Sequence, residues 1–104
     1  MNERVTPDGR YFVVRGRLWR RANPGLAAER REVLVRELMD ARRAVKAALK
    51  SAKPDELALA RKAVDVAKIG LGERGPVWWT DGTPDLNRQR VNDSPYAEWW
   101  KAAR

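Results

Sequence analysis

The sequence contains no cysteine, no histidine and no long apolar segment. Without cysteine the chain forms no disulfide and offers neither a thiolate metal ligand nor a cysteine nucleophile. Without histidine it also lacks the commonest general base and the commonest metal ligand of proteins. No apolar run approaches the roughly 18 residues of a membrane-spanning helix, and no signal-type apolar region is present. These absences predict a cytoplasmic protein that makes no membrane contact.

Catalysis is restricted to the chemistry of Asp, Glu, Lys, Arg and Tyr. Asp81 and Asp85 are the best candidates for a catalytic or metal site, because two carboxylates can hold a hard cation or carry acid–base chemistry. Their neighbours favour a simpler role, since Gly82 is typical of a turn and Pro84 of the first residue of a helix. We therefore predict turn and cap roles for both aspartates, no catalytic residue, no metal site and no cofactor. A hydrolase that uses only carboxylates is the alternative.

Positive charge is abundant and unevenly distributed. The formal net charge is +8, and residues 1–53 hold 14 Lys/Arg against 6 Asp/Glu, whereas residues 54–104 hold 8 of each. Residues 10–21 contain five arginines and no acid. This asymmetry favours an acidic partner such as nucleic acid. A solvated, arginine-rich surface without a partner accounts for the same pattern.

Residues 5–21 are predicted to form a β-hairpin. Residues 11–14 are aromatic and β-branched, which is typical of a strand, and a turn signal precedes them. Gly16 then lies either in a tight hairpin turn or at a bulge in one longer strand. Strict alternation along such a strand would place Trp19 on the same face as Tyr11.

Two helices are predicted over residues 26–50 and 54–70. Apolar residues recur at helical spacing in both. The first helix repeats Leu34, Leu38, Ala41, Val45, Ala48 and Leu49, and the second repeats Leu57, Ala60, Val64, Ala67 and Leu71. Pro54 suits the first position of a helix, and Gly70 and Gly72 suit its end. The short connection favours antiparallel neighbours, hence a helical hairpin.

Residues 72–104 are predicted to form a tail that wraps the core. Four of the five tryptophans lie in it as two doublets, Trp78-Trp79 and Trp99-Trp100. Neighbours in an extended segment point to opposite faces, so we expect one member of the first doublet to be buried and the other half-exposed. The doublets form either the lid of a small core or a surface for a partner.

The fold class that follows is mainly α with a small β element. It comprises an antiparallel two-helix hairpin, an N-terminal β-hairpin and a Trp-rich C-terminal tail with short helices, in a single domain over residues 1–104. In the tail, one short helix is expected from Pro84 to about Val91 and another from Pro95.

Several segments together resemble a small family of bacterial proteins of about this length that has no established activity. They are Pro7-Asp8-Gly9-Arg10-Tyr11, Val14-Arg15-Gly16-Arg17-Leu18-Trp19-Arg20, Glu37-Leu38-Met39-Asp40-Ala41-Arg42-Arg43-Ala44-Val45, Gly72-Glu73-Arg74-Gly75-Pro76-Val77-Trp78-Trp79-Thr80-Asp81-Gly82 and Ser94-Pro95-Tyr96-Ala97-Glu98-Trp99. The resemblance implies a bacterial, cytoplasmic, stand-alone domain and carries no mechanism with it.

The favoured function is a non-catalytic binding module for an acidic partner, with nucleic acid as the leading candidate. Arginines would contact phosphates and aromatic rings would stack on bases. The expected contacts are Arg10, Tyr11, Arg15, Arg17, Trp19, Arg20 and Arg21 in the hairpin, with Arg36, Arg43 and Lys46 on the first helix. The alternative is a protein-interaction or self-associating helical domain, for example a homodimer. Its interface would use Trp78, Trp79, Tyr96, Trp99 and Trp100.

Overall fold

The computed structural model describes residues 4–103, and the chain divides into two compact units. The first unit combines the chain up to Ala22 with the chain from Val77 onward, and the second spans residues 23–76. The apolar stripes of the two helices are buried mainly against each other, within the second unit. The single domain over residues 1–104 that the length suggested stays a prediction. Within residues 4–103, no helix has both the length and the apolar character needed to cross a bilayer.

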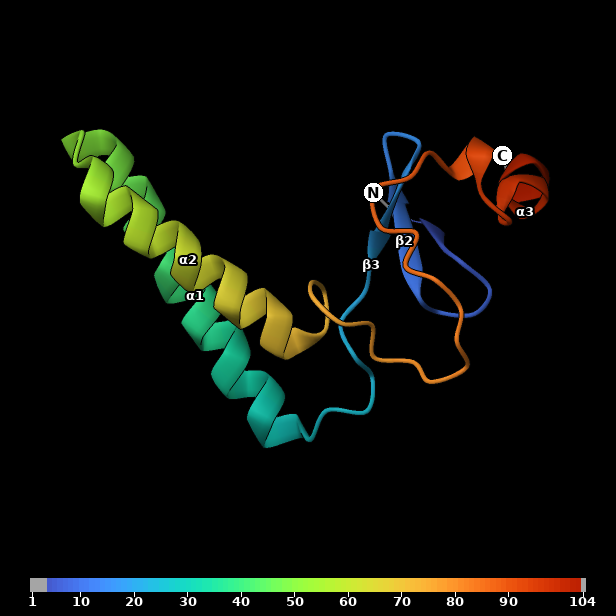
Figure 1. Cartoon of the computed structure of the whole chain (residues 1–104), viewed down its shortest axis with the longest axis horizontal. Helices are drawn as coiled ribbons and strands as arrows, with labels where there is room; N and C mark the ends of the chain where they lie inside the picture. Colours follow the sequence, from blue (N-terminus) through green and yellow to red (C-terminus); the bar gives the residue numbers. More distant parts are fainter. Residues whose placement is uncertain (1–3, 104) are drawn as a thin grey trace. The chain divides into compact units, whose positions relative to one another are not determined.

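The first unit is built on a three-stranded antiparallel sheet in the order β1-β2-β3, with β1 at Arg4–Val5, β2 at Tyr11–Val14 and β3 at Arg17–Arg20 (Figure 1). Arg15 and Gly16 form the β2–β3 turn with positive φ angles of 52° and 78°. Two residues with positive φ are the requirement of the tight turn that suits the twist of a hairpin.

This turn decides which side chains share a face. In the β2–β3 register Phe12 pairs with Trp19, and Val13 pairs with Leu18. The expectation from unbroken alternation, that Trp19 shares a face with Tyr11, is therefore wrong. The chain reverses at two turn residues, and the alternation restarts in the returning strand.

The C-terminal segment continues this sheet. Leu18 donates its N–H to the Gln89 carbonyl at 2.9 Å and accepts the Arg88 N–H at 2.6 Å, and the Val91 N–H reaches the Gly16 carbonyl at 2.8 Å. The tail thus covers the otherwise open edge of β3. The helix predicted from Pro84 to about Val91 is wrong, because these backbone groups bond to β3 instead of to one another.

Short helices close the tail. The 3₁₀ helix η1 spans Val91–Asp93 and α3 spans Ala97–Ala103. The start signal at Pro95 is thus confirmed, with α3 beginning two residues after it. The core of the unit lies between one face of the sheet and this tail. Its buried members are Tyr11, Val13, Leu18, Trp79, Leu86 and Val91.

The second unit is a helical hairpin of α1 (Ala28–Ser51) and α2 (Pro54–Leu71), which lie side by side in Figure 1. The predicted hairpin is confirmed. Ala52 and Gly72 end the two helices in the left-handed conformation. The buried contact is Ala-rich, and its members are Leu34, Leu38, Ala41, Ala48, Ala60, Ala67 and Leu71. Leu49, which the predicted stripe included, is 55% exposed instead.

Candidate nucleic-acid interface

The sheet of the first unit has an outer face, which points away from its core and carries Phe12, Val14, Arg17 and Trp19. Phe12 stands opposite Trp19, and Val14 opposite Arg17, in the β2–β3 register. With Arg15 from the turn, these residues line an open hollow of about 410 Å³. Neither aromatic ring is fully buried. None of the five lining residues is acidic.

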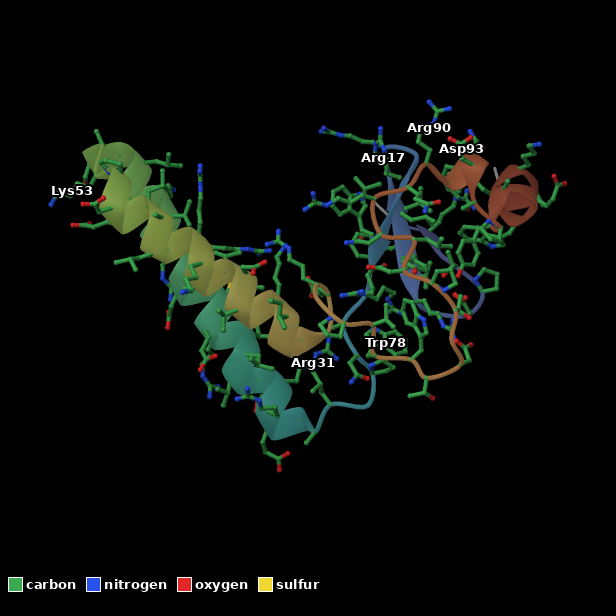
Figure 2. The ribbon with its side chains drawn as sticks, viewed as in Figure 1. Arg17, Arg31, Lys53, Trp78, Arg90 and Asp93 are labelled. Atoms are coloured by element: carbon green, nitrogen blue, oxygen red, sulfur yellow. The ribbon has the colours of Figure 1, made fainter. Side chains whose placement is uncertain are left out.

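Two arginines from the tail, Arg88 and Arg90, lie beside residues that line this hollow. The Arg88 guanidinium lies 5.7 Å from the centre of the Trp19 ring, within the range of a cation–π contact. Arg17 Nη1 donates to the Arg88 carbonyl at 2.9 Å. Arg90 forms a bridge with Arg17 along the β3 edge and pairs with Asp93 at 3.1 Å (Figure 2). The outer face therefore has an aromatic centre and a basic margin.

Of the residues expected to bind nucleic acid, Arg15, Arg17 and Trp19 meet on this face. The expectation is wrong for Tyr11 and Arg20. Tyr11 has 0% exposure, so its ring cannot stack on a base. The Arg20 side chain is likewise 0% exposed, and its Nη1 lies 3.0 Å from Asp85 Oδ2. Both belong to the face of the sheet that the tail covers.

Arg10 and Arg21 lie toward the opposite end of the hairpin. Arg10 Nη2 lies 2.6 Å from Asp81 Oδ2, and its guanidinium lies 4.7 Å from the Trp79 ring centre. Arg21 is exposed and donates from Nη1 to the Gly9 carbonyl at 3.3 Å. Arg10 therefore connects the hairpin to the tail, away from the hollow.

Asp81 and Asp85 take turn roles, whereas the predicted cap role is wrong because no helix begins at Pro84. Asp81 Oδ1 accepts the Thr83 N–H and Asp85 Oδ1 accepts the Asn87 N–H, both at 3.0 Å. Each carboxylate also uses its other oxygen to bind an arginine of the hairpin. Both aspartates thus hold the tail against the sheet.

The three predicted basic residues of α1 belong to the second unit. Arg36, Arg43 and Lys46 are all exposed, and Arg43 forms an ion pair with Asp40 one turn earlier. They do not contribute to the hollow on the outer face.

The tryptophan doublets pack on the core of their own unit. Trp79 is 8% exposed, while Trp78 is half-buried and donates its indole N–H to the Arg21 carbonyl at 2.9 Å. The predicted division of this doublet is confirmed. Trp99, Trp100 and Tyr96 are half-buried against the same core. A partner surface formed by these five residues stays a prediction.

Hydrogen bonds across the first unit change the pKa values of several groups. Burial alone would raise the pKa of Asp8, but hydrogen bonds from Tyr96, Thr6 and the Arg10 N–H together lower it. The hydrogen bond from Arg10 lowers the pKa of Asp81 most strongly. Burial, and then the 2.5 Å hydrogen bond to Asp8, raise the pKa of Tyr96. These carboxylates join residues far apart in the sequence.

We expect acid to destabilise this unit. Since Asp8 and Asp81 have pKa values below the ordinary 3.8 in the folded chain, their contribution is present above that value and is lost as the pH falls through the folded pKa values. The urea midpoint should stay level from neutral pH to about pH 5 and fall below about pH 4. Asp81→Asn should lower the urea midpoint at neutral pH and reduce its decrease in acid. Asp55→Asn in α2 should change neither quantity. A midpoint that stays constant down to about pH 3 would contradict this.

A scan against protein-family models, a search of curated proteins and a search of solved structures each gave no match to this chain. The resemblance to a bacterial family therefore stays a prediction from the sequence segments. The functional argument rests on the geometry of the chain itself.

Four residues around the hollow were absent from the predicted contacts. Phe12 and Val14 were detectable, because a two-residue turn at Arg15-Gly16 places them on the face of Trp19. Arg88 and Arg90 had no local signal. Their approach depends on contacts such as Arg17 to Arg88, which span 71 residues of sequence.

Proposed function

We propose that the chain is a non-catalytic module that binds single-stranded nucleic acid on the outer face of its β-hairpin. The observation that carries this proposal is the Phe12–Trp19 pair, which lies on an open sheet face among arginines and without an acid among the lining residues. A cytoplasmic setting fits the absence of cysteine.

The chemistry of this face suits unpaired bases. Aromatic side chains on an open sheet stack on bases of any sequence, and each stacked base contributes about 1–3 kcal/mol. Arg15 and Arg17 stand beside the rings, where their guanidinium groups can bind phosphates in a planar, forked geometry. A duplex keeps its bases stacked inside the helix, so the ring faces of Phe12 and Trp19 favour a single strand.

Binding should be strongly sensitive to salt. For a labelled single strand of roughly ten nucleotides, three or four phosphate contacts predict a slope of about −2 to −3 in log affinity against log salt concentration. Fluorescence anisotropy between about 50 and 200 mM salt should therefore show an affinity loss on the order of 15- to 60-fold. The same strand in a duplex should bind more weakly.

The arginines provide a matched comparison. Arg17→Gln removes one phosphate contact and should reduce the slope by about 0.7. Arg36→Gln removes an equal charge from α1 and should leave the slope unchanged. Binding that is absent, insensitive to salt or stronger for the duplex would refute the proposed function. An effect of Arg36→Gln that equals that of Arg17→Gln would place the contact on the helices instead.

A further inference from the structure

Three arginines line a pocket on the helical hairpin. Arg42 comes from α1, Arg61 from α2 and Arg74 from the segment that follows α2. The pocket has a volume of about 410 Å³, within the range of about 300–1,000 Å³ that is typical of small-molecule sites. Its remaining lining residues are Val45 and Val64, so none of the five is acidic. We call it the arginine pocket.

Helical spacing brings an arginine and a valine together on each helix. Arg42 precedes Val45 by three residues, and Arg61 precedes Val64 by three, so each pair lies on one side of its helix. The two valines are half-buried, whereas Arg42 and Arg61 are exposed. The valines therefore form an apolar floor with the arginines at its margin. Electrostatic attraction is stronger beside such a floor than in bulk water, because the floor excludes water from one side of a bound ion.

The third arginine is held in place by an ion pair. Arg74 Nη1 lies 3.1 Å from Asp65 Oδ1, and the Arg74 side chain is 35% exposed. This contact uses only part of the guanidinium, which has five N–H donors. In the part of the chain that the structure describes, Arg42 and Arg61 take part in no ion pair. The arginine pocket thus has more positive charge than its protein neighbours neutralise.

A second hollow on the same two helices has a different charge. Glu37 and Asp40 line it from α1 and Lys62 lines it from α2, so charges of both signs meet there. The arginine pocket shares none of its lining residues and contains charges of one sign only. Like charges repel one another, and an anion placed among them is attracted by all of them. The arginine pocket is therefore complementary to a ligand with several negative charges.

We propose that the arginine pocket binds an oligophosphate, a chain of two or three linked phosphoryl groups, either free or carried on a nucleotide. Phosphoryl groups supply several acceptor oxygens each, and guanidinium groups bind them in a planar, forked geometry. Arginines from three segments can bind more than one phosphoryl group. No aromatic ring is among the lining residues, so the pocket offers a strand of nucleic acid no surface for base stacking. The site lies on the second unit and is independent of the proposed single-strand site.

Isothermal titration calorimetry of the full chain tests the ligand class. Inorganic tripolyphosphate, added without divalent cations, should bind at one site per chain. Inorganic phosphate at matched ionic strength should bind about tenfold more weakly or less, because it forms fewer charge-assisted hydrogen bonds. A nucleoside triphosphate identifies the source of the ligand. If it binds as tightly as tripolyphosphate, the ligand is carried on a nucleotide, and if it binds more weakly, the ligand is the free oligophosphate.

Substitutions locate the binding in the arginine pocket. Arg42→Gln and Arg61→Gln should each weaken tripolyphosphate binding by about tenfold or more. Arg61→Lys keeps the charge but loses the forked donor pair, so it should also weaken binding. Arg36→Gln removes an equal charge from α1 outside the pocket and should leave the affinity unchanged. Trp19→Leu, on the proposed single-strand face, should leave it unchanged as well.

Thermal unfolding followed by circular dichroism separates a binding role of the arginines from a structural one. Arg61→Gln should not lower the midpoint of the free chain, because it removes one of several like charges. It should reduce the rise in midpoint that tripolyphosphate causes.

Four outcomes would overturn the proposal. They are an absence of binding at millimolar tripolyphosphate, an equal affinity for inorganic phosphate, a tighter binding of citrate, and an effect of Arg36→Gln equal to that of Arg61→Gln. If Arg42→Gln and Arg61→Gln weaken single-strand binding and leave tripolyphosphate binding unchanged, these arginines belong to the nucleic-acid surface and the pocket is not an oligophosphate site. Single-strand binding that depends on Trp19 would survive each of these failures, so the two proposals can fail separately.

Discussion

Replacing Tyr11 with alanine is expected to cost the first unit about 3–5 kcal/mol in its free energy of unfolding. Tyr11 is fully buried, and its ring lies 5.7 Å from the Trp79 ring and 5.8 Å from the Tyr96 ring. Its hydroxyl also accepts the Leu86 N–H at 2.8 Å. The substitution removes both the aromatic packing and this hydrogen bond between strand and tail.

Tyr11→Phe separates these two contributions. It keeps the ring and leaves the buried Leu86 N–H without its acceptor, so we expect a loss of about 1–3 kcal/mol. Burial raises the pKa of Tyr11, so its hydroxyl stays neutral in the physiological pH range. A loss from Tyr11→Phe as large as that from Tyr11→Ala would contradict a core role for the ring.

The chain offers a separate signal for each unit. All five tryptophans belong to the first unit, while the long helices α1 and α2 belong to the second. Tyr11→Ala should therefore shift the urea midpoint seen by tryptophan fluorescence and leave the helical circular dichroism transition in place. Leu34→Ala, in the buried face of α1, should do the reverse. Equal shifts in both signals would mean that residues 1–104 unfold as one cooperative domain.

Trp19→Leu is expected to weaken single-strand binding by about 5- to 150-fold, which corresponds to the loss of one stacked base at about 1–3 kcal/mol. Leucine retains apolar bulk beside Phe12 and removes the aromatic surface together with the contact to Arg88. Phe12→Leu should act in the same direction with a smaller effect, because its ring is smaller. Anisotropy titrations at one fixed salt concentration measure both.

The matched control for this experiment is Trp99→Leu. Trp99 is half-buried like Trp19, but it lies on α3 and does not line the hollow. Its substitution should leave the affinity unchanged while circular dichroism reports the same helical content. If Trp99→Leu weakens binding as much as Trp19→Leu does, the contact surface includes α3, and the outer face is not the site.

The helical hairpin was predictable because its determinants are local. Apolar residues such as Leu34 and Ala67 recur at helical spacing, and Pro54 and Gly72 mark helix ends through their own backbone preferences. The division of Trp78 from Trp79 was also predictable, since alternation along an extended segment requires it. The β-hairpin was predictable for the same kind of reason, from its strand composition and Gly16.

The site was less predictable because its surroundings come from distant segments. The burial of Arg20 depends on Asp85 and the position of Arg10 on Asp81, and neither pairing leaves a local pattern. The course of residues 88–91 is set by their backbone hydrogen bonds to Gly16 and Leu18, which override the start signal at Pro84. Tertiary hydrogen bonds here outweigh local preference.

The first unit is discontinuous in the sequence, and this has a consequence for synthesis. The helical hairpin is an insertion between Ala22 and Val77, and the core of the unit joins Tyr11 and Leu18 to Leu86 and Val91 across it. On the ribosome, α1 and α2 have the contacts they need as soon as both have emerged. The β-hairpin, although made first, must wait with the Tyr11 face of its sheet uncovered until the tail arrives. The helical hairpin, although made after the β-hairpin, can therefore complete its fold before the first unit does.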